Sequence, residues 1–323
     1  MEEAWRDVIV RERAAGRRVD AFLARRFPSY SRSQIVRYIQ EGKVTSTSRN
    51  LKPSTTLMLG EVLRLYMPGL VPSGPPPPVP EILFEDEDLM VVQKPPGMLV
   101  HPAGDQFVWA LIGLVRAVRP NDEVDLVHRI DRETSGALLL TKKKTLNSLL
   151  KKQLIKRGMH KTYMALVHGR PIWEQLDIEE PISHRDGSEI RLRRGVVEGG
   201  QYCRTGVKVL DRGPLFSLVE CTLYTGRTHQ IRVHLEHVGH PLVGDKLYGH
   251  SDEMFLNYLE QGVTQEMRQR IRFPRHCLHS HTIAFMDTNG EYRKFKAPLF
   301  ADMAQLIVSR QLGWTEDMDI ENY

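Results

Sequence analysis

The chain has 323 residues, of which 41% are hydrophobic and 26% are charged, and its formal net charge is +5. This composition is typical of a folded, water-soluble protein with more than one domain. The apolar runs are far shorter than the roughly 20 residues that span a bilayer. Because the charged N-terminus also lacks the apolar core of a signal peptide, we expect a cytoplasmic protein. Three widely spaced cysteines exclude a disulfide framework and a CxxC metal site.

The first predicted domain, residues 1–67, is strongly basic. Residues 11–49 contain ten Lys/Arg and three Asp/Glu, a surplus that exceeds the net charge of the whole chain. The residues alone leave two interpretations open, a solvated helix face or a surface that binds a polyanion.

Two helices and a strand are predicted within this domain. Apolar residues at helical spacing predict the first helix; they are Val19, Phe22, Leu23 and Phe27. Ser31 and Gln34 form a capping box that opens the second helix, which Gly42 ends. Residues 61–66 then predict a strand.

Seven prolines within residues 68–80 predict an extended, semi-rigid linker. In residues 81–305, strand-like segments outnumber helical ones without a βαβ rhythm, which predicts an α+β fold built on a mixed sheet. The predicted strands are 82–84, 89–92, 138–141, 162–167, 216–223 and 281–286, and residues 145–158 predict a helix. We expect the acidic residues 306–323 to form a peripheral C-terminal tail.

The segment His128–Gly136, HRIDRETSG, contains the candidate catalytic carboxylate. Asp131 lies between cationic residues at a probable strand end, where a neighbouring arginine favours the ionised carboxylate that a nucleophile or a base requires. On these residues alone, an aspartate that merely caps the turn is the alternative.

Four further segments of similar character accompany HRIDRETSG. In chain order the five are KPPGMLVHP (94–102), HRIDRETSG (128–136), HKTYMA (160–165), TGRTHQIRVH (225–234) and HPLVGDKLYG (240–249). Together they resemble the ordered motifs of the RluA-type pseudouridine synthases and cover most of residues 81–250. The basic residues 1–67 are similar to an S4-like RNA-binding domain.

The resemblance implies a fold and a reaction. The fold is a mixed, largely antiparallel sheet of the pseudouridine synthase type with flanking helices, preceded by a small α/β S4-like domain. The reaction is the isomerisation of uridine to pseudouridine in RNA, without metal or cofactor, on a base flipped out of its helix. Asp131 matches the essential aspartate, which acts on C1′ or on the C2′ proton. Tyr163 matches the tyrosine that stacks on the base and aids deprotonation at C5, and Arg227 matches the arginine that pairs with the aspartate.

Other residues are assigned to RNA contacts. By resemblance, Arg129 fills the space left by the flipped base, and His128 hydrogen-bonds either the backbone or the RNA. Arg232 either contacts phosphate or braces the sheet, since it alternates with apolar neighbours. In the N-terminal domain we expect Arg18, Arg32 and Arg37 to contact phosphates.

Family analogy favours large-subunit ribosomal RNA over transfer RNA as the partner. We also expect the protein to be a monomer and to make no contact with a membrane. A catalytically silent RNA-binding protein with the same fold is the alternative function, and a metal-dependent nuclease is a weaker one. In His276–His281, HCLHSH, alternate side chains could bind a metal, but we expect a structural strand and no metal. Residues 184–194 predict a mobile, RNA-facing loop or simply a solvated one, and residues 251–275 predict a helical insertion that touches RNA or only a surface decoration.

Overall fold

The computed structural model describes residues 5–10, 12, 14–26, 32–66, 77–101, 110–156 and 158–309. The chain divides into two compact units, the first comprising Met1–Pro78 and His101–Leu114 and the second Val79–Val100 and Val115–Tyr323. The division after Pro78 falls within the predicted linker, most of which lies outside the described residues. Residues 101 and 110–114, which we expected in the second domain, group with the first unit.

The first unit contains a three-stranded antiparallel sheet in the order β1-β3-β2 and two helices. The elements are β1 (Trp5–Ile9), α1 (Val19–Arg26), α2 (Arg32–Gln40), β2 (Val44–Ser46) and β3 (Val62–Tyr66). Val19 and Leu23 of α1 pack with Ile35 and Ile39 of α2 in one buried cluster. The predicted helices and strand are therefore confirmed, although Phe27 and the capping residue Ser31 lie outside the described residues.

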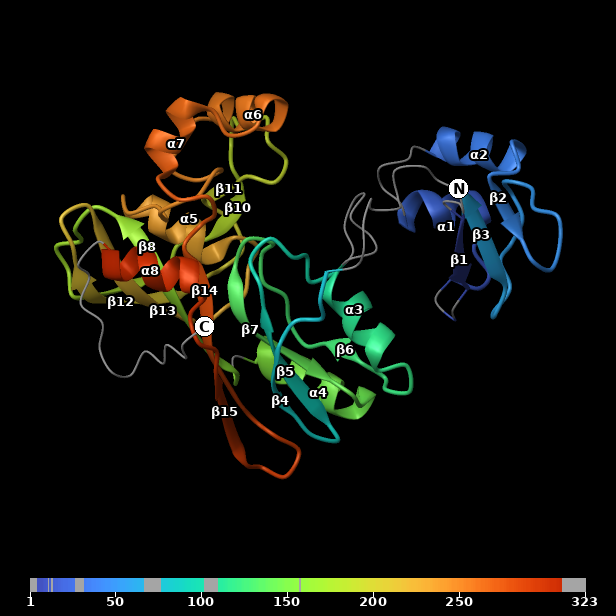
Figure 1. Ribbon diagram of the computed structural model, residues 1–323, viewed down its shortest axis with the longest axis horizontal. Coiled ribbons are helices and arrows are strands. Elements are labelled where there is room, and N and C mark those ends of the chain that lie inside the picture. The colour runs from blue at the N-terminus through green and yellow to red at the C-terminus, as the bar shows by residue number, and fades with distance from the viewer. Residues whose placement is uncertain are drawn as a thin grey trace. The chain divides into compact units, whose positions relative to one another are not determined.

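The second unit is built on a ten-stranded mixed sheet (Figure 1). Its main path runs β4-β5-β7-β14-β8-β13-β12-β9, with β15 paired to β14 and β6 to β7. Among the described pairings in this sheet, only β7 with β14 is parallel. The strands are β4 (Ile82–Glu85), β5 (Leu89–Lys94), β6 (Asp125–Leu126), β7 (Ser135–Thr141), β8 (His160–His168), β9 (Gln175–Ile178), β12 (Thr205–Arg212), β13 (Phe216–Leu223), β14 (Leu278–Met286) and β15 (Tyr292–Lys296). A separate hairpin pairs β10 (Ile182–His184) with β11 (Arg194–Val196).

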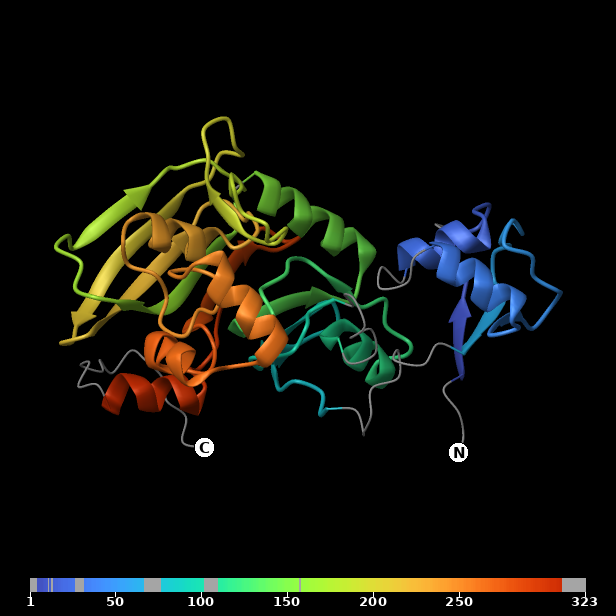
Figure 2. The same cartoon turned by 90° about the horizontal axis from the view of Figure 1, so that it is seen from above.

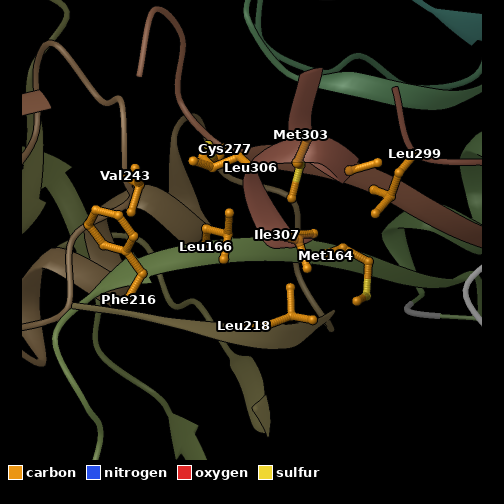
Figure 3. Packing of buried hydrophobic residues seen from close by; sticks show 11 residues of the cluster. Met164, Leu166, Phe216, Leu218, Val243, Cys277, Leu299, Met303, Leu306 and Ile307 are labelled. Carbon is orange, nitrogen blue, oxygen red and sulfur yellow. The ribbon is translucent and has the colours of Figure 1, made fainter. Parts of the chain in front are cut away.

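The remaining helices are α3 (Leu111–Val118), α4 (Lys144–Ile155), α5 (Gln230–His237), α6 (Asp252–Gln261), α7 (Gln265–Ile271) and α8 (Ala301–Ser309). In the second unit α8 lies beside the β8–β13 part of the sheet (Figure 2). Met303, Leu306 and Ile307 of α8 pack there against Met164 and Leu218 (Figure 3). The expectation that the tail begins at residue 306 is therefore wrong, because residues 306–309 complete a helix whose apolar side is buried.

The two faces of strand β8 differ in what they contact. One face packs against the α8 core, and we call the opposite face, which carries Lys161 and Tyr163, the functional face of the sheet. Successive side chains of a strand point to opposite faces. Since Met164 and Leu166 face the α8 core, Lys161 and Tyr163 lie on the other face.

Gly136 allows β7 and β14 to pair closely. Its φ is +107°, and a Cβ at this position would lie 2.3 Å from the carbonyl oxygen of Ser280. Only glycine combines this backbone conformation with so close an approach. The Gly136 of HRIDRETSG thus fixes the strand that directly follows the loop of Asp131.

Two segments that the sequence left open are ordered parts of the second unit. Residues 184–194 connect the β10–β11 hairpin, and Arg193 within them is buried, where it pairs with Asp252 and Glu236. The prediction of a mobile or solvated loop is wrong for this arginine. Residues 251–275 contain α6 and α7, so this segment is helical, and its contact with RNA stays a prediction.

Candidate active site

A pocket of about 350 Å³ opens on the functional face of the sheet, within the size range of small-molecule sites. It is lined by residues 127–131 of the loop before β7, by Lys161 and Tyr163 of β8, and by residues 226–232 at the start of α5. Three of the five motif segments therefore meet at one cavity, although they are distant in sequence.

Asp131 is held in the pocket by Arg232. Nη1 of Arg232 donates to Oδ2 of Asp131 over 2.9 Å. On its other side the guanidinium donates through Nε and Nη2 to the two carboxylate oxygens of Asp245, over 2.7 and 2.9 Å. One arginine thus joins two aspartates from different motifs, and the two-pronged contact fixes the direction in which its third nitrogen points.

Asp245 is a fully buried anchor for this arginine. Its Oδ1 also accepts the backbone N–H groups of Leu247 and Tyr248. The chain turns here at Gly244, whose φ of +80° suits glycine. A larger residue would not fit, because a Cβ at that position would lie within 2 Å of the Arg275 carbonyl oxygen. The tight Gly-Asp turn of HPLVGDKLYG therefore serves to position Arg232.

The electrostatics of the pocket keep Asp131 ionised. Burial alone would raise its pKa, but Arg232 and the neighbouring rings of His229 and His276 outweigh it, so the pKa of Asp131 lies below its ordinary value. An ionised carboxylate is what a nucleophile or a general base requires.

His229 has an unusual backbone conformation beside this carboxylate. It precedes α5 with a φ of 60°, a conformation uncommon for residues other than glycine. Its Nδ1 hydrogen-bonds the hydroxyl of Tyr248 at 2.8 Å, and its Nε2 lies 3.8 Å from Asp131. Because burial lowers the pKa of His229 to about 4, the ring is neutral at pH 7. Such strained residues gather at functional sites.

Tyr163 forms part of the pocket wall as a neutral phenol. It is buried on β8, and burial together with the charge of Asp131 raises its pKa well above the ordinary value. An aromatic ring in this position offers a flat apolar face to a planar ligand.

The first motif, KPPGMLVHP, holds the turn that carries Asp131. Lys94 is fully buried, and its ammonium donates to the carbonyl oxygens of Pro95, Met98 and Arg132 over 2.7 to 2.9 Å. The N–H of Gly97 donates to the same Arg132 oxygen. Burial lowers the pKa of Lys94 to about 7.

Residues after Asp131 are tied to other motifs in the same way. Glu133 pairs with Lys246 and accepts the N–H of His276. The hydroxyl of Thr134 hydrogen-bonds Nε2 of His276 at 2.8 Å. The segments KPPGMLVHP, HPLVGDKLYG and HCLHSH therefore all brace the loop that presents the carboxylate.

The expectation that Arg227 pairs with Asp131 is wrong for this structure, since Arg232 makes that contact. Arg227 is exposed at the pocket, and its Nε approaches the carbonyl oxygen of Tyr202 at 3.4 Å. Arg232 is buried between the carboxylates of Asp131 and Asp245, so the expectation that it braces the sheet is wrong. The cause is local, because residues 230–237 form a helix and Arg232 lies in its first turn.

The other predicted RNA contacts differ in exposure. Arg129 is exposed at the pocket, whereas His128 is buried and its Nε2 accepts the N–H of Leu139. Of the two partners expected for His128, the structure therefore shows the backbone. Arg18 and Arg32 both pair with Asp20 while their side chains remain more than half exposed. Arg37 is exposed beside Glu41.

Sequence reasoning gave no role to Lys94, Lys161, His229 or Asp245, although each lies within a quoted motif. Metal ligation at His276–His281 receives no support, since His279 hydrogen-bonds Ser135 and Ala297, and His281 also hydrogen-bonds Ala297. Within the described ranges, no cluster of three His, Cys, Asp or Glu is arranged to hold a metal. None of the helices described is long and apolar enough to cross a membrane.

Comparison with known proteins defines the class. Residues 88–237 match the family model for RNA pseudouridylate synthase, a span that contains Asp131, Tyr163 and Arg232. The chain belongs to the RNA pseudouridine synthase family, whose enzymes isomerise uridine to pseudouridine in RNA, and the family resemblance of its motifs is confirmed.

Individual relatives are similar over nearly the whole chain. An uncharacterised RNA pseudouridine synthase, YlyB, from Bacillus subtilis is 34% identical over 93% of this chain and 96% of its own length. Ribosomal large subunit pseudouridine synthase D of Xylella fastidiosa is 35% identical over 94% of this chain and 92% of its own length. The structure of human RNA pseudouridylate synthase domain containing 4 is similar in fold, with a TM-score of 0.58 and 23% identity over 72% of this chain and 94% of that one.

Proposed function

We propose that this protein converts specific uridines of large-subunit ribosomal RNA to pseudouridine and that Asp131 is its essential catalytic residue. The observation that carries the proposal is the partly exposed, ionised carboxylate of Asp131, held by Arg232 in a pocket beside the ring of Tyr163. The ribosomal target rests on relatives named ribosomal large subunit pseudouridine synthase D, which cover most of the chain.

In this proposal, the flipped uracil stacks on Tyr163 while Asp131 faces the sugar. The N1–C1′ bond breaks and its electron pair leaves with the base. Either Asp131 forms a bond to C1′, or it accepts the C2′ proton and a double bond forms between C1′ and C2′. The base then turns so that C5 bonds to C1′, which releases the Asp131 oxygen or returns the C2′ proton. Loss of the C5 proton, with a proton taken up at N1, completes a balanced isomerisation without a co-reactant.

Tyr163 is proposed to take part in the last step as well as in stacking. Its raised pKa means that no phenolate is present in the free enzyme. The hydroxyl therefore acts as a relay, in which its oxygen accepts the C5 proton as its own proton passes toward Asp131. Such positioned proton transfer contributes about 10²- to 10⁴-fold to a rate.

RNA is proposed to lie across the exposed arginines at the pocket. Arg129 takes the place of the flipped base, and Arg227 contacts a phosphate, since both side chains are exposed there. Residues 1–67 act as an S4-like RNA-binding domain through Arg18, Arg32 and Arg37, whose exposure suits phosphate contacts. Phosphate contacts release counterions, so binding should weaken steeply with salt.

The test is to incubate the purified full chain with structured large-subunit ribosomal RNA and, separately, with transfer RNA, and to map pseudouridine chemically. We expect pseudouridine at discrete sites of the ribosomal RNA. Absence of the product on every structured RNA, with RNA binding intact, would instead support a catalytically silent RNA-binding protein. Cleaved RNA chains that depend on added metal would indicate a nuclease.

A further inference from the structure

Lys161 is a buried cation whose ammonium makes no structural hydrogen bond or ion pair with the described residues. Its side chain is 4% exposed and lines the pocket from β8, two residues before Tyr163 and on the same face of the sheet. The Lys161 ammonium lies near the loop before α5. A Cβ placed on Gly226 of that loop would be 3.7 Å from Nζ of Lys161.

The other buried lysines of the described chain have partners. Three carbonyl oxygens surround the ammonium of Lys94, and Lys246 pairs with Glu133 and the carbonyl oxygen of Pro274. For Lys161, the described residues provide no hydrogen-bond acceptor and no carboxylate within ion-pair distance, and burial is the one cause of its pKa shift. Burying a charge without a partner is costly, so an unpaired ammonium facing a pocket indicates that the partner arrives with a ligand.

The neighbours of Lys161 do not neutralise it. His128 is the nearest titratable ring, and burial followed by the charge of Lys161 lowers the pKa of that ring to about 3. Burial lowers the pKa of Lys161 itself to about 8, so the ammonium form still predominates at pH 7. The other charged and titratable groups of the pocket are the Asp131–Arg232 pair, Tyr163, His229 and the exposed Arg129 and Arg227.

Two groups of the substrate are candidates for this ammonium, a phosphate of the backbone and a carbonyl oxygen of the uracil ring. Phosphates remain outside a pocket that receives a base, where the exposed Arg129 and Arg227 are available. Lys161 is buried beside Tyr163, the residue proposed to stack on the base. Its position therefore fits a ring oxygen better than a phosphate.

We propose that Lys161 is a further catalytic residue, whose ammonium binds a carbonyl oxygen of the flipped uracil and stabilises the anion formed when the N1–C1′ bond breaks. The inference rests on the proposed function. The electron pair of the broken bond is delocalised from N1 onto the ring oxygens, and a fixed cation in a water-poor site stabilises such developing charge strongly. When C5 attacks C1′, the negative charge leaves the ring and the ammonium gives up no proton.

The experiment compares the full-length wild type with Lys161→Met and Lys161→Arg under single-turnover conditions on a modified RNA. We expect Lys161→Met to lower the rate constant by about 10²- to 10³-fold, as for loss of a charge-stabilising donor. RNA affinity and its salt dependence should stay within about threefold of wild type, and Lys161→Arg should recover at least about tenfold of the lost rate. An unchanged rate constant in Lys161→Met overturns the inference. So does a defect confined to RNA affinity with a shallower salt dependence, which would indicate a phosphate contact.

Two further measurements separate catalysis from structure. Removing an unpaired buried charge should leave the Tm of Lys161→Met unchanged or higher, whereas a lowered Tm or a failure to fold would show that Lys161 is structural. Fluorine at C5 withdraws charge from the ring, so RNA containing 5-fluorouridine should show a smaller defect. Because this base has no C5 proton to lose, the step that is followed is the exchange of the N1–C1′ bond for the C5–C1′ bond, detected by chromatography of the released nucleosides. An equal defect on both substrates contradicts the inference. If the wild type converts no uridine at all, the proposed function itself fails; if only the Lys161→Met results disagree, the inference alone fails.

Discussion

Arg232→Met separates the electrostatic role of Arg232 from the general need for positive charge at the pocket. Arg232 lies 2.9 Å from Asp131, and burial opposes ionisation of that carboxylate. An adjacent cation lowers the pKa of a carboxyl group by about 1 to 3 units, equivalent to about 1.4 to 4 kcal/mol. Without Arg232 the pKa of Asp131 should therefore rise.

A higher pKa of Asp131 should change the pH dependence of kcat/KM in a known direction. Protonation inactivates Asp131, so the acid limb of kcat/KM should move to higher pH. The assay is tritium release from RNA labelled at C5 of uridine, measured from pH 4 to pH 9. The defect of Arg232→Met should be largest near pH 5 and smaller at pH 8.

Arg227→Met is the matched control, because it removes a second arginine from the same pocket that does not contact Asp131. It should weaken RNA binding and make the salt dependence shallower, while the acid limb keeps its position. If Arg227→Met moves the acid limb and Arg232→Met does not, our assignment of the ion pair is incorrect. Since Arg232→Met also leaves the buried Asp245 unpaired, it should lose about 3 to 5 kcal/mol of stability and needs assay at low temperature.

Three other substitutions test individual parts of the site. Tyr163→Phe keeps the stacking ring but removes the relay, so tritium release should fall by about 10²- to 10⁴-fold with RNA affinity retained; near-normal release would exclude the relay. Lys94→Met leaves three carbonyl oxygens without their hydrogen-bond donor, so the Tm of this variant should fall clearly, in contrast to that of Lys161→Met. An unchanged Tm would show that Lys94 does not hold the turn that carries Asp131. Gly136→Ala places a Cβ 2.3 Å from the Ser280 carbonyl oxygen, so denaturant unfolding should show a loss of several kcal/mol; a stability equal to wild type would contradict the close pairing of β7 and β14.

The sequence predicted the strands and helices whose apolar pattern is regular. β13 has the predicted bounds, and α1 and α4 begin within one residue of their predicted starts. The motif order also predicted that the HRIDRETSG, HKTYMA and TGRTHQIRVH segments form one site, and they do line one pocket.

The sequence did not identify Arg232 as the partner of Asp131, because the alternation of Ile231 and Val233 indicates a strand as readily as a helix. In the structure these residues are both buried in an eight-residue helix, α5, which directs Arg232 to the carboxylates. The left-handed backbone of His229 before this helix has no signature in residue type. The buried Arg193 was missed for a similar reason, because its partners Glu236 and Asp252 lie 43 and 59 residues away.

The most direct test of the central claim compares the wild type with Asp131→Asn on ribosomal RNA. This substitution keeps the shape of the side chain and removes its charge, so RNA binding should be nearly unchanged. Tritium release from C5 and chemical mapping should both detect pseudouridine with the wild type and none with Asp131→Asn. Full activity of Asp131→Asn, or no pseudouridine from the wild type on any structured RNA, would contradict the account.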